Sequence, residues 1–235
     1  RQRQAAHPQT ATAAVPIPAQ ASPAAADLET LRAMLGASKR PMMVIGGSGW
    51  TAEACARITA FATANDLPVA NSFRRQDLMD NRLANYAGDA GVGMNPALAR
   101  RLTECDLLLV VGAQLGDVLT EGYSLLQVPR PRQTVVHVLA GPEELGKVYE
   151  ADLPINSGMP QFAAAVVELE PVKAAAWTQW TRDARADYEA NIVPDGTRGA
   201  LDFAHVMVWL RENLPEDAIV ANGAGNFAAW VHRYY

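Results

Sequence analysis

The sequence predicts an α/β fold: a Rossmann-like parallel sheet with helices on both faces, followed by an incomplete second α/β unit. Short runs that are apolar throughout alternate with amphipathic segments, which is typical of strands buried on both faces and separated by helices. Glycine-rich corners follow several of these runs, the first at Gly47 and Gly49. The chain has 235 residues, 49% of them hydrophobic and 19% charged, enough for one large domain and part of another.

The first segments along the chain are a linker and a helix. Residues 1–26 are rich in Ala, Pro, Gln and Thr, a composition typical of an extended interdomain linker. The central Rossmann-like domain is expected over residues 27–170. It opens with a helix for which Asp27 is the expected N-cap, and Gly36 and Pro41 end that helix.

The remainder of the central domain alternates strands and helices. Strands are expected at 41–47, 67–72, 106–114, 133–141 and 151–158, and helices at 51–65, 95–105 and 159–169. Right-handed crossovers between parallel strands place every strand-to-helix loop at one edge of the sheet, where ligands of such sheets bind.

The last part of the sequence begins a second unit. Residues 171–198 are expected to form a connecting helix and linker, and residues 199–235 the truncated start of another α/β domain. A helix over 201–215, a strand with a glycine turn over 217–225 and a helix over 226–235 are expected there. Roughly 37 residues cannot close a core alone. The sequence also lacks an initiator Met, so we expect a fragment of a larger protein.

Composition excludes several classes of partner and compartment. The net charge is −5 with a sequence pI of about 5.4 and no dense Lys/Arg cluster, which disfavours nucleic acid and anionic membranes as partners. Cys55 and Cys105 are too few for a disulfide framework and stand at apolar helix positions, as inert core cysteines do. No apolar run is long enough to span a membrane and no signal peptide is seen. We therefore expect a cytoplasmic protein.

The glycine corner after the first strand fits a permissive dinucleotide-binding pattern, GxGxxA, starting at Gly47. That pattern also needs an acidic residue at the end of the second strand to hold a ribose, and this strand ends in Asn71 and Ser72. An NAD-dependent oxidoreductase is therefore disfavoured. A Gly-x-Ser-x-Gly nucleophile elbow fails because Trp50 occupies the last glycine position. The alternative is a tight strand-to-helix turn without a ligand.

Two further segments are candidate ligand contacts. Gly88, Gly91 and Gly93 precede a helix start and form either a ligand cradle or a mobile loop. Gln114 and Asp117 follow the most apolar strand, at the same predicted edge of the sheet. They either contact a ligand there or have only a structural role in the loop.

No catalytic or metal-binding set of residues is evident. The four histidines lie far apart, and no Cys/His spacing indicates a metal site. His137 is expected in a strand with its ring hydrogen-bonded. Glu143 and Glu144 are expected to open a helical turn, favoured there by the helix dipole.

Four segments in this order resemble the thiamine diphosphate-dependent enzymes of the acetolactate synthase-like group. They are RPMMVIGGSGW, DLLLVVGAQLGD, VVHVLAGPEELGKVYEADLPI and LPEDAIVANGAGNFAAWVHRYY. The resemblance covers nearly the whole chain. It implies the central domain of a three-domain subunit together with the start of the C-terminal diphosphate-binding domain.

The resemblance also implies where the cofactor would bind. Gly225, Asn226 and Phe227 match the turn that lies close to thiamine diphosphate. The family's catalytic glutamate belongs to the first domain, and its Mg²⁺-binding Gly-Asp-Gly…Asn segment to the remainder of the third. Neither is present here, so the resemblance implies no catalytic residue, no metal ligand and no activity for these residues alone.

In some relatives the central domain binds FAD or ADP, and in others it binds nothing. Flavin-binding members carry an Arg where this chain has Gln114, and Asp residues where it has Leu139 and Ala140; a further Asp falls near Gly158. The missing charge-assisted contacts are worth about 1.5–3 kcal/mol each, which favours a domain without FAD. If a nucleotide does bind, the expected contacts are Gly47, Gly49, Gly91, Gly93 and Gln114.

The function that the resemblance implies is a fragment of a 2-keto acid lyase or transferase, acetolactate synthase-like or decarboxylase-like. The intact enzyme would use thiamine diphosphate and Mg²⁺, act on a small 2-keto acid, and assemble as a homodimer or homotetramer. The alternative is a stand-alone FAD- or ADP-binding Rossmann-like module without catalysis.

Overall fold

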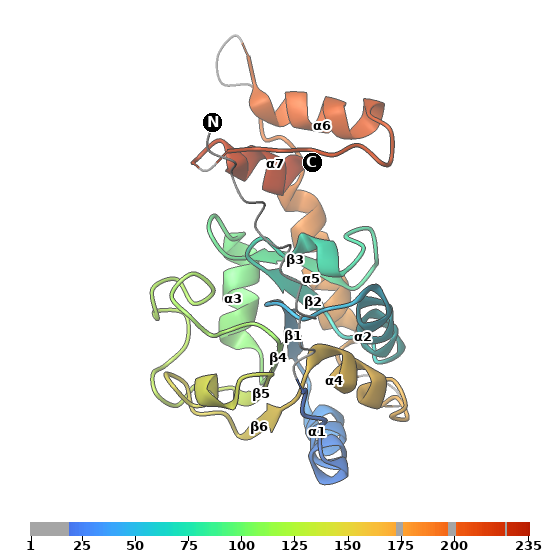
Figure 1. Ribbon diagram of the computed structural model, residues 1–235. Coiled ribbons are helices and arrows are strands. Elements are labelled where there is room, and N and C mark those ends of the chain that lie inside the picture. Colours follow the sequence, from blue (N-terminus) through green and yellow to red (C-terminus); the bar gives the residue numbers. More distant parts are fainter. Residues whose placement is uncertain (1–18, 173–175, 197–200, 224) are drawn as a thin grey trace, which may run out of the picture.

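The computed structural model describes residues 19–172, 176–196, 201–223 and 225–235. Its centre is a six-stranded sheet in the order β3-β2-β1-β4-β5-β6, in which all neighbouring strands are parallel (Figure 1). The strands are β1 (Pro41–Ile45), β2 (Val69–Ser72), β3 (Tyr86–Ala90), β4 (Leu107–Val111), β5 (Thr134–Leu139) and β6 (Leu153–Asn156). The predicted Rossmann-like α/β fold class is confirmed.

Helices cover both faces of this sheet. They are α1 (Ala25–Ala37), α2 (Ala52–Ala64), α3 (Pro96–Glu104), α4 (Met159–Val166), α5 (Thr178–Asn191), α6 (Phe203–Asn213) and α7 (Ala228–Tyr234), with 3₁₀ turns η1 (Gln76–Leu78) and η2 (Pro142–Glu144). One face packs against α1, α2 and α4, and the other against α3 (Figure 1). Every residue of β1 and β4 is buried, as expected for strands that are apolar on both faces.

The N-cap prediction for α1 is wrong. The N-cap lies three residues earlier, at Ala24, which makes no side-chain capping bond, so Asp27 lies in the first turn. An acidic side chain is still favourable there because of the helix dipole. In the preceding segment, the carbonyl of Ala21 accepts a hydrogen bond from the Gly158 N–H at 3.0 Å. The described end of the predicted linker therefore contacts the start of α4.

Part of the predicted glycine-rich loop is in fact the edge strand β3. Residues 86–90 pair with β2, with a register irregularity between Val69 and Ala70. Gly88 and Asp89 have low strand propensity, which concealed this strand in the sequence. Buried Tyr86 anchors it by packing edge-on against Tyr188 of α5, with ring centroids 4.9 Å apart.

The connection to the C-terminal segments is held by hydrogen bonds. Buried Trp177 donates its indole N–H to the carbonyls of Asn65 and Asp66, at 3.1 and 2.9 Å. Arg185 of α5 donates to the carbonyls of Asn81 and Leu83. These contacts fix the start of α5 beside the end of α2.

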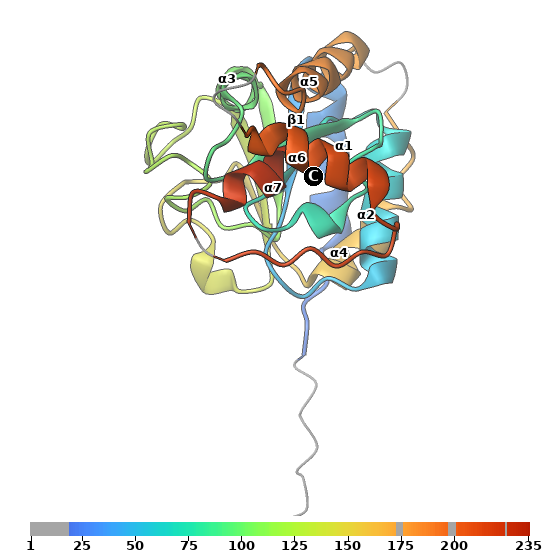
Figure 2. The same cartoon turned by 90° about the horizontal axis from the view of Figure 1, so that it is seen from above.

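The C-terminal unit, residues 201–223 and 225–235, lies at the β3 end of the sheet domain (Figures 1 and 2). Its predicted helices form as α6 and α7, but the strand predicted at 217–225 does not, within the described residues 217–223 and 225. A strand needs a hydrogen-bonded partner, and no described strand lies beside this segment. Its Ile219 side chain is accordingly 95% exposed. None of the described helices is long and apolar enough to cross a membrane.

Candidate functional site

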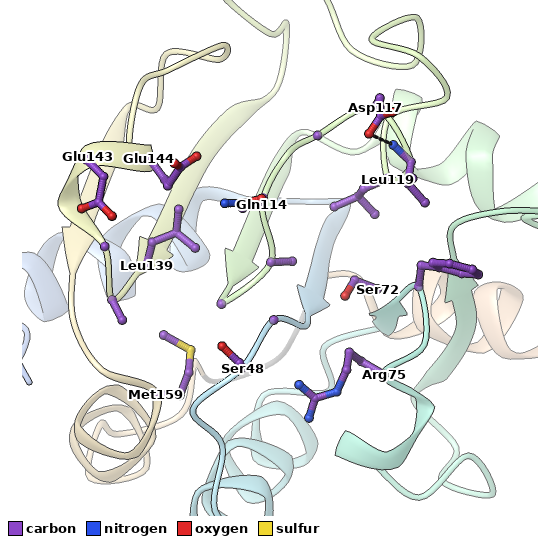
Figure 3. A pocket seen from close by; sticks show the side chains of 18 residues that line it. Ser48, Ser72, Arg75, Gln114, Asp117, Leu119, Leu139, Glu143, Glu144 and Met159 are labelled. Carbon is purple, nitrogen blue, oxygen red and sulfur yellow. Dashed lines mark hydrogen bonds between the residues drawn. The ribbon is translucent and has the colours of Figure 1, made fainter. Parts of the chain in front are cut away.

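A cavity of about 800 Å³, here called the edge cavity, opens at the carboxyl edge of the sheet (Figure 3). It lies over β1 and β4, where the strand order reverses, the position at which doubly wound sheets bind ligands. The loops after β1, β2, β4 and β5 and the first residue of α4 line it. Its size falls within the range of small-molecule sites.

The glycines after β1 are required by the packing of two loops. A Cβ atom at Gly47 would overlap the carbonyl oxygen of Gly112, and one at Gly46 would overlap the Ser72 hydroxyl. Gly47 also has φ of 68°, which favours glycine. Trp50 donates its indole N–H to the Gly46 carbonyl at 2.7 Å. This corner therefore holds the loops after β1 and β4 together at the floor of the edge cavity.

The lining of the edge cavity carries more negative than positive charge. Arg75 is the one cation among the lining residues, and its guanidinium is paired with Asp77 at 3.0 Å. Asp117, Glu143 and Glu144 supply three carboxylates (Figure 3). This balance opposes binding of a diphosphate, which requires uncommitted cations or backbone N–H groups.

The structure brings some of the candidate residues to the edge cavity and not others. Gly47 and Gln114 line it, whereas Gly49, Gly91 and Gly93 do not. Gly91 packs instead on Phe73: a Cβ atom there would lie 2.6 Å from the Phe73 Cβ.

The positions at which flavin-binding relatives carry acids are occupied here by other groups. Leu139 and Ala140 line the edge cavity, and Gly158 precedes the lining residue Met159. At the end of β2, Ser72 lines the cavity while the amide of fully buried Asn71 has no hydrogen-bond partner among the described residues. The lining at Leu139, Ala140 and Ser72 thus offers no carboxylate at these positions.

Other predicted side chains behave as follows. The His137 ring is hydrogen-bonded as predicted: its Nε2 lies 2.9 Å from the Ala113 carbonyl oxygen. The helical turn predicted at Glu143 and Glu144 is confirmed as η2. Cys105 is buried, although it caps α3 rather than lying inside it, and burial raises the pKa of its thiol to about 12. Cys55 is half-buried, and burial raises its pKa as well.

The residues that the resemblance assigns to thiamine diphosphate lie in the C-terminal unit. Gly225 has φ of 128°, as a glycine turn allows, and Phe227 is 45% exposed. Neither of these residues nor Asn226 lines the edge cavity. In the part of the chain that the structure describes, Phe227 packs edge-on against Phe203 of α6, with ring centroids 5.3 Å apart. Within the same described ranges, no group of three or more His, Cys, Asp or Glu side chains could hold a metal ion.

Sequence reasoning missed Arg75, Phe73 and Ser48 as lining residues. A signal was available for all three, because each follows the end of a buried strand and such loops share one edge of a parallel sheet.

The fold and cavity define a doubly wound α/β domain with its ligand edge over a topological switch point. The chain belongs to the thiamine pyrophosphate enzymes: the central domain of this family matches residues 28–166. The match agrees with the sheet and helices described above.

Curated relatives extend the similarity beyond the central domain. The chain is 29% identical over 203 residues to the acetolactate synthase large subunit of Parasynechococcus marenigrum, covering 84% of this chain and 32% of that protein. It is 23% identical over 209 residues to the acetolactate synthase isozyme 2 large subunit of Escherichia coli, covering 89% of this chain and 37% of that protein. The chain thus spans about a third of the length of these curated relatives.

Proposed function

We propose that this chain acts as the central part of a thiamine diphosphate-dependent lyase or transferase acting on 2-keto acids, acetolactate synthase-like or decarboxylase-like. The observation that carries the proposal is the similarity to acetolactate synthase large subunits over 203 and 209 residues, longer than the central domain itself. Regions equivalent to the remaining two thirds of those relatives would complete the enzyme. They would supply the catalytic glutamate and the Mg²⁺ ligands.

In this proposal the described residues serve two purposes. The sheet domain is a scaffold between the cofactor-binding regions. The C-terminal unit presents Gly225, Asn226 and Phe227 to thiamine diphosphate once other regions cover it. Exposed apolar side chains in this unit, among them Trp209 at 60%, support its being covered in an assembled enzyme.

Thiamine diphosphate enables loss of CO₂ from a 2-keto acid and addition to a second carbonyl. A homodimer or homotetramer in the cytoplasm is part of the proposal.

The edge cavity is proposed not to hold FAD. Its three carboxylates and its single, paired guanidinium support this, as do the apolar side chains of Leu139 and Ala140. The test is the absorbance of the purified protein between 350 and 500 nm, with ADP titrated separately by calorimetry. A colourless protein that binds no ADP is expected. A flavin band or a saturable ADP isotherm would support the alternative, a nucleotide-binding module.

The main proposal is tested by release of CO₂ from pyruvate. The 235-residue chain alone is expected to be inactive with thiamine diphosphate and Mg²⁺, and the complete native enzyme containing it to be active only with both. Asn226→Ala in that enzyme is expected to raise the thiamine diphosphate concentration needed for half-maximal activity. The matched control is Asn213→Ala at the end of α6. Activity of the chain alone, or an active enzyme that ignores thiamine diphosphate, would overturn the proposal.

A further inference from the structure

The glycine turn of the C-terminal unit, Gly225–Phe227, is not held by close packing of its glycines. A Cβ atom added at Gly223 or Gly225 would meet no atom of the described residues within 4 Å, in contrast to the tight packing at Gly47. The three carbonyls of the turn accept hydrogen bonds of 3.1 to 3.2 Å from the next three N–H groups, which join the turn to the start of α7. The place of the turn therefore depends on what holds α7 and on the side chain of Phe227.

The carboxyl end of α7 is fixed to the rest of the molecule by three side chains. Arg233 donates to the Asn191 carbonyl at the end of α5, at 2.6 Å. Tyr234 is buried in the small core of the C-terminal unit. The His232 ring lies 6.0 Å from the ring of Phe73, in the loop after β2. The glycine turn lies at the opposite end of α7, so these contacts do not place it directly.

One aromatic side chain, Phe203 of α6, contacts the turn and the amino end of α7. Its ring packs edge-on against Phe227, with centroids 5.3 Å apart and an angle of 88° between the planes. It also lies 6.1 Å from the ring of Trp230. Both distances lie in the range of favourable aromatic pairs. Phe203 is thus joined to the last residue of the turn and to the first turn of α7.

Phe203 is itself held at the start of α6. Asp202 is the N-cap of this helix, and its carboxylate accepts a hydrogen bond from the Ala204 N–H at 2.9 Å. Ala204 belongs to the buried core of the C-terminal unit. The residues on both sides of Phe203 are therefore fixed, while its own ring is 39% exposed. Replacing this ring should disturb the turn without removing the core of the unit.

We infer that Phe203 is a positioning residue, which holds the turn Gly225–Phe227 in the place where thiamine diphosphate would bind. The identity of the cofactor rests on the proposed function, whereas the contact between Phe203 and the turn does not. Phe203 acts through Phe227 and Trp230 and not on the cofactor. A turn that is already ordered loses less conformational entropy on binding, so the ring is expected to strengthen cofactor binding.

The first measurement is deuterium exchange of the 235-residue chain without cofactor. Phe203→Leu keeps an apolar side chain and removes the ring. The three amides that donate within the turn are expected to exchange about threefold to tenfold faster than in the wild type, and those of β4 at the same rate. Phe203→Tyr keeps the ring and is expected to match the wild type. The control is Trp209→Leu, on the same helix but 60% exposed, which is expected to leave the turn unaltered.

The second measurement uses the complete native enzyme, with thiamine diphosphate as the probe. Phe203→Leu is expected to raise the thiamine diphosphate dissociation constant, measured by calorimetry, about threefold or more, and the concentration needed for half-maximal CO₂ release by a similar factor. Turnover at saturating cofactor is expected to stay within about twofold of the wild type, because the ring does not touch the reacting atoms. Phe203→Tyr is expected to restore cofactor binding.

Equal exchange of the turn in Phe203→Leu and the wild type would overturn the inference, as would the same acceleration in Trp209→Leu. In the complete enzyme, an unchanged thiamine diphosphate requirement or a fall in turnover alone would also overturn it. Failure of the proposed function is distinguishable because it is seen in the wild type, as activity that ignores thiamine diphosphate. That result would overturn the part of the inference that concerns the cofactor, and the exchange measurement would still decide the part that concerns the turn.

Discussion

The sheet domain and the C-terminal unit bury very different amounts of apolar surface. The sheet domain has two continuous cores, one on each face, built from all six strands and from α1 to α5. The C-terminal unit buries Ala204, Met207 and Tyr234 and leaves Ile219 and Trp209 exposed. Because small units cannot bury enough surface to be stable alone, the second unit depends on contacts outside itself. The same chain thus contains a self-sufficient fold and a dependent one.

Hydrogen exchange tests this contrast most directly. Amides of β1 and β4 are expected to exchange through global unfolding, and those of α6 through local opening, about a hundredfold faster or more. Mass spectrometry after timed deuterium labelling measures both regions in one sample. Equal protection in β4 and α6 would show that the two units unfold together and would break the comparison.

Phe162→Ala is expected to give the largest loss among the substitutions considered. Phe162 is fully buried between α4 and the sheet, so its truncation should lower the free energy of unfolding by about 3–5 kcal/mol. Urea unfolding followed by circular dichroism measures the loss. The matched control in the C-terminal unit is Trp209→Ala, which is expected to stay within about 0.5 kcal/mol of the wild type. Similar losses for both would contradict the difference in burial.

Gly47→Ala tests the loop packing beneath the edge cavity. The added Cβ would overlap the Gly112 carbonyl and occupy a left-handed backbone position, at an expected cost of about 1–3 kcal/mol. Gly36→Ala is the control: it lies in α1, an added Cβ meets no atom within 4 Å, and the change should stabilise by about 0.5–1 kcal/mol. Thermal unfolding of both variants measures the two effects. If both midpoints shifted in the same direction, the loss of stability in Gly47→Ala would not come from close contact between the loops.

Asp89→Asn tests whether a buried carboxyl group in the edge strand β3 makes the stability of the sheet domain depend on pH. Burial raises the pKa of Asp89 to about 7, above the value of about 3.9 expected in the unfolded chain. The folded chain therefore binds this proton more tightly, and stability is lost as pH rises from about 4 to about 7. At pH 8 the variant should be more stable than the wild type by about 1–2 kcal/mol, with a smaller difference at pH 5. A difference that does not depend on pH would exclude titration of Asp89.

Prediction from sequence succeeded where local pattern and burial agree. β1 and β4 are apolar throughout, and the Thr51 and Asn95 side chains cap α2 and α3, so these elements lie close to their predicted bounds. β3 was missed because its strand character comes from pairing with β2 and from the Tyr86 contact with Tyr188, neither of which is local.

The candidate site was predicted only in part, for the same reason. Gly47 and Gln114 follow strongly patterned strands and do line the edge cavity. Tyr149 follows no such strand, yet it lines a smaller cavity of about 230 Å³ together with His137. The sequence spacing of these two residues carries no signal that they line one cavity.

The helix-free crossover of residues 112–133 has a consequence for how this domain can diversify. A helix couples its residues, because a change on its packed face disturbs neighbours three and four positions away. An irregular segment carries no such periodic constraint, so an exposed residue such as Tyr123 can be exchanged while the sheet beneath keeps its register. The exposed positions of this segment are therefore where the scaffold can change its surface by single substitutions.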